Sequence, residues 1–225
     1  TSCDGIRTVT LPAKHTAVKD AAIAATVFKA GKKEGSHCKV CGKVLRKQIT
    51  VAKLKPTISL TASSLKMKAG QSTTAFKAAG LAKGDYVTKV TSGNTGIVKV
   101  SSVTKKGTFR LTAGKKAGST TVKVILASKK SASFKVTVQR GAVKTSKITV
   151  STKSVTLKKG TTYRKLASSV KVTPVTSQEK VTYTSSNKKI ATVTSGGVIK
   201  GLKKGTATIT IRSGSKRTTC KVTVK

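Results

Sequence analysis

The stretch that decides the fold is residues 181–224, VTYTSSNKKIATVTSGGVIKGLKKGTATITIRSGSKRTTCKVTV. Apolar and polar residues alternate in its short runs, as at Ile209 and Ile211 and again at Cys220 and Val222. Turn-forming residues separate these runs at 185–187 (SSN), 195–197 (SGG) and 213–215 (SGS). Period-2 alternation places one set of side chains on each face of a strand. The stretch therefore predicts several short antiparallel strands of a β-sandwich.

Similar segments occur twice in the chain, in the same order. Four pairs of segments correspond: 65–70 with 155–160, 94–100 with 187–193, 115–122 with 203–209, and 134–138 with 220–224. Their spacing of about 85–93 residues is close to the length of one Ig-type sandwich. We therefore predict an all-β chain with two tandem Ig-like β-sandwiches, at 55–141 and 142–225, and a small cysteine-containing β-hairpin module at 1–54.

Residues 182–187 (TYTSSN), followed by 190–193 (IATV), resemble the "VTWSSSN…VATV" core of bacterial Ig-like domains of group 2. The blocks at 197–199, 204–210 and 220–224 match the later strands of that family in the right order. Tyr183 stands where the family usually has Trp, and it can fill the same core pocket if its hydroxyl finds a partner. The resemblance, over roughly 143–225, implies an extracellular module of a secreted or cell-wall-attached bacterial protein, often tandem and often adhesive.

The net charge is the strongest compositional feature. The chain has 47 Lys and Arg against five acidic residues, a formal charge of +42. Such a field favours polyanions such as sulfated or sialylated glycans, mucin and cell-wall polymers like teichoic acid. The simpler interpretation is that Lys keeps the modules soluble and protects their sheet edges. The candidate polyanion-binding residues are lysine pairs at predicted turns: Lys115, Lys116, Lys129, Lys130, Lys158, Lys159, Lys188, Lys189, Lys203 and Lys204.

Two other partner classes find less support. Nucleic acid is expected to bind only non-specifically, because stacking aromatics are scarce and no groove-reading element is visible. Membrane insertion is not expected, because no run of about 18 apolar residues occurs. The opening Thr1-Ser2-Cys3 is unlike a signal peptide, so we expect a mature or excised piece whose export signal or wall anchor lies outside it.

The N-terminal module has its own pattern. Residues 24–43 (ATVFKAGKKEGSHCKVCGKV) resemble short cysteine-containing repeats in secreted proteins of gut Firmicutes, which run "ATCTKAGKTEGSHCSVCGKVL…IPATGH". Val27 replaces the first Cys of that pattern, and residues 51–54 replace its closing "PATGH". Residues 3–16 look like the end of a preceding copy. The Thr and Val content favours a strand over a helix at 21–28.

The CxxC motif of this module admits three interpretations. Cys38 to Gly42 looks like one zinc knuckle, and a closed zinc site needs four ligands, for which Cys3, His37 and His15 are the other candidates. A disulfide suits a secreted protein, and free thiols are the third alternative. Structural zinc thus stays open, and no other cofactor is expected. By contrast, Cys220 takes the place of Phe134 in the repeat and is expected in the core.

Enzyme chemistry finds little support. The five acidic residues are scattered, at Asp4, Asp20, Glu34, Asp85 and Glu179, and both His lie in the small module. The loop at 113–120 lacks the spacing of a phosphate-binding loop. The expected function is therefore non-catalytic, with adhesive binding to anionic host glycans, mucin or a host protein. The alternative is a spacer that displays an enzyme or binding head outside this stretch and associates with the anionic wall.

Overall fold

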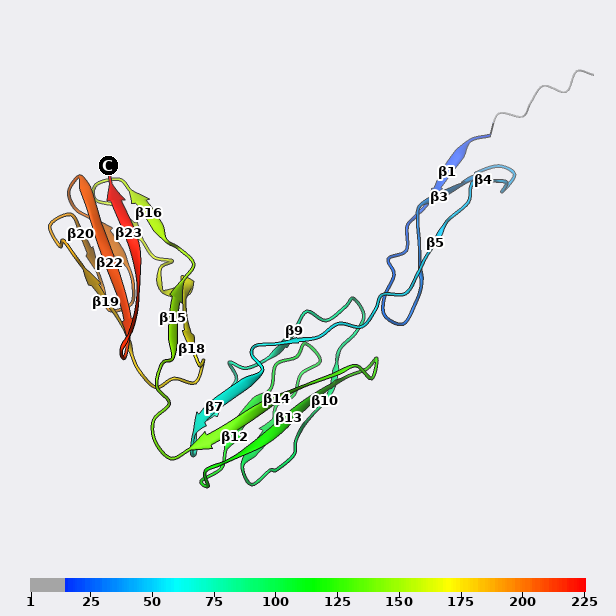
Figure 1. The fold of residues 1–225 in the computed structure, drawn as a ribbon. Helices are drawn as coiled ribbons and strands as arrows, with labels where there is room; N and C mark the ends of the chain where they lie inside the picture. Colours follow the sequence, from blue (N-terminus) through cyan, green and yellow to red (C-terminus); the bar gives the residue numbers. More distant parts are fainter. Residues whose placement is uncertain (1–14) are drawn as a thin grey trace, which may run out of the picture. The chain divides into compact units, whose positions relative to one another are not determined.

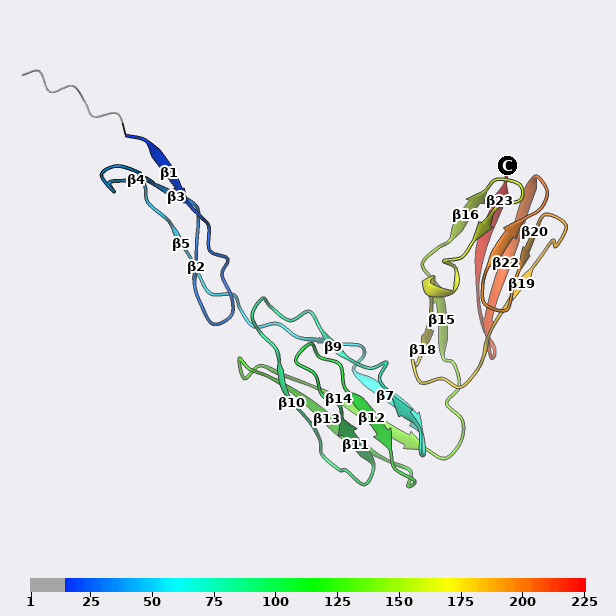
Figure 2. The ribbon, with the colours of Figure 1, turned by 180° about the vertical axis from the view of Figure 1, so that it is seen from behind.

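The computed structural model describes residues 15–225, and the chain divides into two compact units, residues 1–57 with 81–85 and residues 58–80 with 86–225. The described part of the first unit contains short strands: β1 (Ala17–Asp20), β2 (Gly31–Lys32), β3 (Gly35–Cys38), β4 (Val44–Arg46) and β5 (Thr50–Val51). β1, β3 and β4 form an antiparallel sheet in the order β1-β3-β4, and β2 pairs with β5 (Figures 1 and 2).

The prediction of a strand at 21–28 is wrong. The segment is irregular apart from one bridge between Ile23 and Lys32. The Thr26 hydroxyl accepts the N–H groups of Phe28 and Lys29 at 3.2 and 2.9 Å, so the chain turns instead of extending. This is the local side-chain-to-backbone bonding by which Thr competes with a strand ladder.

The second unit holds two sandwiches. The first is built from β6 (Ser59–Leu60), β7 (Ser64–Lys68), β8 (Ser72–Thr73), β9 (Ala78–Ala79), β10 (Val87–Ser92), β11 (Val98–Ser101), β12 (Arg110–Ala113), β13 (Gly118–Leu126) and β14 (Ser131–Gln139). One sheet has the order β10-β13-β14-β7, with β7 parallel to β14, and the other has the order β11-β12-β8. A further short ladder joins β6 to β9.

The second sandwich is built from β15 (Lys147–Val150), β16 (Ser154–Leu157), β17 (Thr162–Tyr163), β18 (Val170–Thr173), β19 (Val181–Ser185), β20 (Ala191–Val193), β21 (Ile199–Gly201), β22 (Gly205–Ser213) and β23 (Lys216–Val224), with one 3₁₀ turn at Ala167–Ser169. Its sheets have the orders β16-β23-β22-β19 and β17-β21-β20, and β15 pairs with β18. Strand for strand, this is the topology of the first sandwich. The all-β fold with two Ig-like sandwiches is confirmed.

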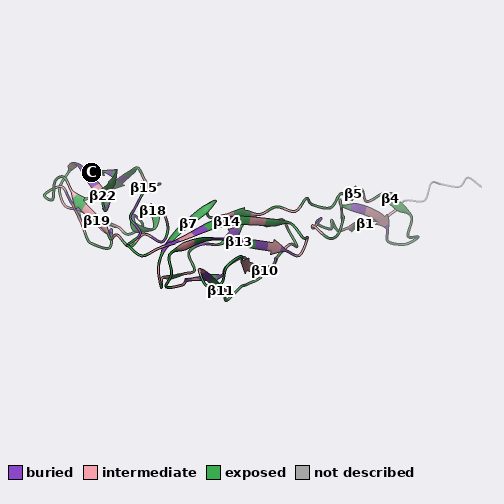
Figure 3. Ribbon diagram, turned by 60° about the horizontal axis from the view of Figure 1, so that its bottom comes forward, coloured by how far each residue is buried: buried purple, intermediate pink, exposed green. Residues whose placement is uncertain are grey.

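The cores follow from the alternation in the sequence. In β22 the side chains of Ile209 and Ile211 are fully buried, and Arg212 between Ile211 and Ser213 is exposed. Figure 3 shows buried and exposed residues alternating along strands of both sandwiches. Cys220 is buried opposite Ile209, as Phe134 is buried opposite Val122, so its predicted place in the core is confirmed.

Candidate functional site

The candidate lysine pairs all lie in turns between strands, and all ten side chains are exposed. A turn lysine is often merely solvated, so exposure alone does not make a site. The arrangement of the turns is more informative, because topology decides which of them meet.

Three of the five pairs meet at one end of the second sandwich. β16 runs parallel to β23 with Leu157 opposite Val224, so the turn after β16 lies beside the end of β23. β22 begins with Gly205 opposite the same Val224, which places the turn before β22 at this end too. The Lys203 N–H donates to the Ile190 carbonyl at 3.3 Å and thereby brings in the turn before β20. We call this set the lysine end: Lys158, Lys159, Lys188, Lys189, Lys203 and Lys204.

The one acidic residue of 142–225 lies at the opposite end of this sandwich. Glu179 lies two residues before Val181, the first residue of β19, which pairs with Ser213 at the β22–β23 hairpin. Its carboxylate accepts the Thr145 N–H at 2.7 Å, and the Thr145 hydroxyl bonds to that of Ser213 at 2.7 Å. The lysine end therefore has no acidic side chain from its own sandwich beside it.

A shallow hollow borders the lysine end. It is lined by Tyr183, Thr184, Ser185, Lys188, Thr192 and Val193. The Tyr183 ring packs against the core and stays partly exposed, and burial raises the pKa of its hydroxyl. The hollow thus sets an aromatic ring and hydroxyl groups beside Lys188. Sequence reasoning assigned Tyr183 to the core alone, and the alternation of β19 carried no signal for this second role.

The other two pairs do not converge. Lys115 and Lys116 precede β13, and Lys129 and Lys130 follow it, so a nine-residue strand separates them in the first sandwich. Charge in this sandwich is spread between its two ends.

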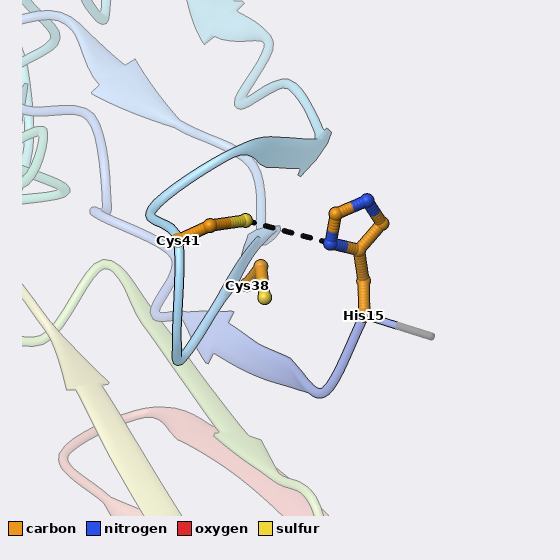
Figure 4. Close-up of side chains that lie close together, drawn as sticks. All are labelled: His15, Cys38 and Cys41. Atoms are coloured by element: carbon orange, nitrogen blue, oxygen red, sulfur yellow. Dashed lines mark hydrogen bonds between the residues drawn. The ribbon is translucent and has the colours of Figure 1, made fainter. Parts of the chain in front are cut away.

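A second cluster lies in the N-terminal module. His15, Cys38 and Cys41 offer ligand atoms that all lie within 4.8 Å of one another (Figure 4). The His15 Nδ1 and the Cys41 Sγ are 3.5 Å apart. Of the two other predicted candidates, Cys3 lies outside the described residues, and the His37 Nδ1 contacts the Asp20 carboxylate at 2.7 Å, away from this cluster.

The elements around Cys38 explain the cluster. Cys38 ends β3 and faces Ala17 of β1, two residues after His15. Gly42, at φ +72°, closes the turn, and its N–H donates to the Cys38 carbonyl at 3.0 Å. The backbone N–H groups of Cys41 and Val40, with the His15 side chain, stabilise the Cys38 thiolate and lower its pKa from 9.0 to about 6. Both thiols are free in the structure.

No helix among residues 15–225 is long and apolar enough to cross a membrane. A search of the curated proteins found no match to the chain. Among solved structures, domains 5–6 of the S-layer protein SbsC align over 75% of this chain and 96% of their own, at 21% identity and a TM-score of 0.39. Cadherin domains 1–4 of protocadherin gamma B7 align over 88% and 57%, at 11% identity and a TM-score of 0.34.

The scan against protein families matches the second sandwich. Residues 144–224 fit the model of the bacterial Ig-like domain (group 2). The match covers the strands from β15 to β23 and includes the lysine end. The resemblance of the N-terminal module to cysteine-containing repeats stays a prediction. The second sandwich belongs to the bacterial Ig-like domains of group 2.

Proposed function

We propose that this chain is a non-catalytic extracellular surface module, secreted or attached to the cell wall, that binds anionic glycans or mucin through the lysine end. One observation carries the proposal: topology gathers three exposed lysine pairs at an end of the sandwich that has no acidic side chain of its own. Several exposed lysines gathered at one end of a domain hold a polyanion by summed, salt-sensitive contacts.

The hollow beside Lys188 supports a glycan over other polyanions. A partly exposed tyrosine ring with neighbouring hydroxyls suits a sugar, which presents an apolar ring face and hydrogen-bonding groups. Catalysis is not proposed, because Glu179 is the only acidic residue of 142–225 and its carboxylate bonds the Thr145 backbone. A general acid and base pair would need a second titratable group beside it.

The second candidate function is that of a spacer with affinity for the anionic wall. It is favoured by the four lysines of the first sandwich, which are divided between both ends of β13. Binding to the cell wall as a tether would need only positive charge spread over the surface. Binding of a glycan at a defined site would need the lysines gathered at the lysine end.

The test compares two variants of equal charge. One replaces the six lysines of the lysine end by Ser; the other replaces six exposed lysines of the first sandwich: Lys89, Lys115, Lys116, Lys129, Lys130 and Lys135. Both reduce the formal net charge from +42 to +36. Binding to sulfated glycans, sialylated mucin and teichoic acid is measured at about 0.15 M and about 0.5 M salt, because screening weakens exposed charge contacts.

We expect the lysine-end variant to bind a glycan at least about tenfold more weakly than the control variant. Equal losses in both variants would favour the diffuse tether. No binding by the unmodified chain at either salt would overturn adhesion and leave the spacer. A host protein that stays bound at the higher salt would point to a shape-specific receptor site instead.

A further inference from the structure

Residues 15–54, the described part of the N-terminal module, form almost no hydrophobic core. Among residues 15–54, only Ala25 and Cys38 are buried apolar residues. Eight of the exposed large apolar side chains of the described chain belong to this segment: Val18, Ile23, Phe28, Val40, Val44, Leu45, Ile49 and Leu54. Segments of about 40 residues without a core usually need a disulfide, a metal or a partner to stay folded. The module therefore requires a source of stability other than apolar burial.

The His15, Cys38 and Cys41 cluster has the chemistry to supply it. Two thiolates and an imidazole are the donors that zinc prefers, and they balance its charge of +2 with two negative charges. In tetrahedral zinc sites the bond lengths are about 2.3 Å to sulfur and about 2.0–2.1 Å to nitrogen, which puts neighbouring S and N ligands about 3.5–3.6 Å apart. The Cys41 Sγ and His15 Nδ1 are 3.5 Å apart.

Backbone hydrogen bonds hold the three ligand residues close together. The β1–β3 ladder pairs Ala17 with Cys38, and the Lys39 N–H donates to the Thr16 carbonyl at 2.9 Å, so the segment after His15 is fixed against the CxxC turn. The Cys38 N–H donates to the Lys43 carbonyl at 2.8 Å and closes that turn from the other side. Preorganisation of this kind lowers the entropic cost of assembling ligands.

A disulfide explains the arrangement less well. A bond between Cys38 and Cys41 would close only a four-residue loop inside one turn, and short loops gain the least from cross-linking. It would also leave His15 without a role. A metal ion would join the start of β1 to the β3–β4 turn, and these segments lie 23 residues or more apart in sequence.

We propose that His15, Cys38 and Cys41 bind one zinc ion per chain and that this ion stabilises the N-terminal module. The fourth coordination position is open to a further ligand, since Cys41 lies exposed at the surface. The site is separate from the lysine end and does not depend on glycan binding.

The test uses the full chain, reduced and free of any affinity tag. Zn²⁺ alone is titrated in a chelator-buffered series, and Co²⁺ serves as a spectroscopic probe. We expect one ion per chain, with a sulfur-to-cobalt charge-transfer band and the visible bands of a tetrahedral ion. Cys41→Ser and His15→Asn should each weaken binding at least about a hundredfold, more than the loss typical of an outer-shell change.

The chain offers matched controls for both ligand types. His37→Asn removes the other histidine and Cys220→Ala removes a thiol from the second sandwich; both should keep one ion per chain. His15→Cys keeps the site with a third thiolate, so it should still bind and should raise the charge-transfer intensity. This variant separates a lost ligand from a module that has lost its fold.

Three results would overturn the site. They are no uptake of Zn²⁺ by the reduced unmodified chain, a cobalt spectrum without thiolate charge transfer, and a loss of binding in His37→Asn as large as in His15→Asn. The stabilising role is tested separately by proteolysis within residues 15–54. Adding a chelator should accelerate this proteolysis in the unmodified chain, and it should leave the rate unchanged in Cys41→Ser. Equal protection with and without zinc would contradict that role.

Discussion

Single residues explain how the two sandwiches share a topology but not a core. Strand register makes Tyr183 the counterpart of Val90 and Cys220 that of Phe134. In the first sandwich Phe109 and Phe134 stack with ring centroids 6.2 Å apart. In the second, a Cβ built on Gly197 would lie 3.1 Å from the Tyr183 ring, so the glycine leaves room for the tyrosine. Large and small residues have exchanged places across the core.

Replacing Gly197 by Ala should therefore destabilise the second sandwich. Its Cβ would crowd both Ala167 and Tyr183, and the residue has φ +75°. Gly160→Ala is the matched control, because Gly160 has φ +83° and nothing within 4 Å of its Cβ position. Urea denaturation should show a loss of unfolding free energy for Gly197→Ala that exceeds the control by about 1–3 kcal/mol. Equal losses would mean that backbone strain alone matters.

Cys220 should make the second sandwich less stable in alkali. Burial raises the pKa of its thiol above the ordinary value of 9.0, against a smaller lowering effect of Lys153. Above about pH 9 the unfolded chain loses this proton more readily than the folded chain, so the free energy of unfolding falls as pH rises. Cys220→Val removes the group, and the drop in stability from pH 8 to pH 10 should be smaller in the variant. A drop of the same size in both would show that other groups cause it.

Sequence patterns predicted which residues are buried, but they did not predict which residues from distant segments lie close together. Alternation placed Cys220 in the core because a strand has only two faces. His15 entered the sequence argument only as one candidate ligand among several, because pairing of β1 with β3 decides which histidine reaches the CxxC turn. His37 has the closer sequence position, yet its ring contacts Asp20.

At the scale of elements, β22 and β23 form the best-defined unit of the second sandwich. They pair over nine positions, from Gly205 opposite Val224 to Ser213 opposite Lys216. The turn at 213–215 and the strict alternation made this hairpin predictable from sequence. The segment 21–28 was not predictable in that way, because the hydroxyl of Thr26 competes locally with strand pairing and leaves no trace in a hydrophobic pattern.

The two faces of β22 should respond differently to truncation. Ile209 is fully buried between the sheets, so Ile209→Ala should lower the unfolding free energy by about 2–5 kcal/mol. Arg212→Ala, in the same strand on the exposed face, should change it by less than about 0.5 kcal/mol. Guanidinium denaturation of both variants checks this. A loss for Arg212→Ala as large as for Ile209→Ala would contradict the register.

At the scale of the whole molecule, charge rather than topology sets the two sandwiches apart from ordinary Ig-type modules. The repeat predicted the number and order of strands, because each copy carries its own turns and alternation. It could not predict the lysine end, since three turns far apart in sequence meet only through the parallel pairing of β16 with β23 and the contact of Lys203 with Ile190. The two lysine pairs of the first sandwich also lie in turns, yet they stand at opposite ends of β13.

This charge should make the stability of the chain depend on salt in an unusual direction. A net charge of +42 repels itself in the compact state, and residues 58–80 and 86–225 contain a single acidic residue, Glu179. Raising NaCl from about 0.1 M to about 1 M shortens the Debye length from about 10 Å to about 3 Å and screens that repulsion. We expect the melting temperature of the sandwiches to rise over this range in calorimetry. The lysine-end variant, which lacks six of the positive charges in one sandwich, should already melt higher at low salt and gain less from added salt. A melting temperature that falls with NaCl would show that favourable charge contacts outweigh self-repulsion. The gathering of six lysines at the lysine end would then be explained by their contribution to stability and not by ligand binding.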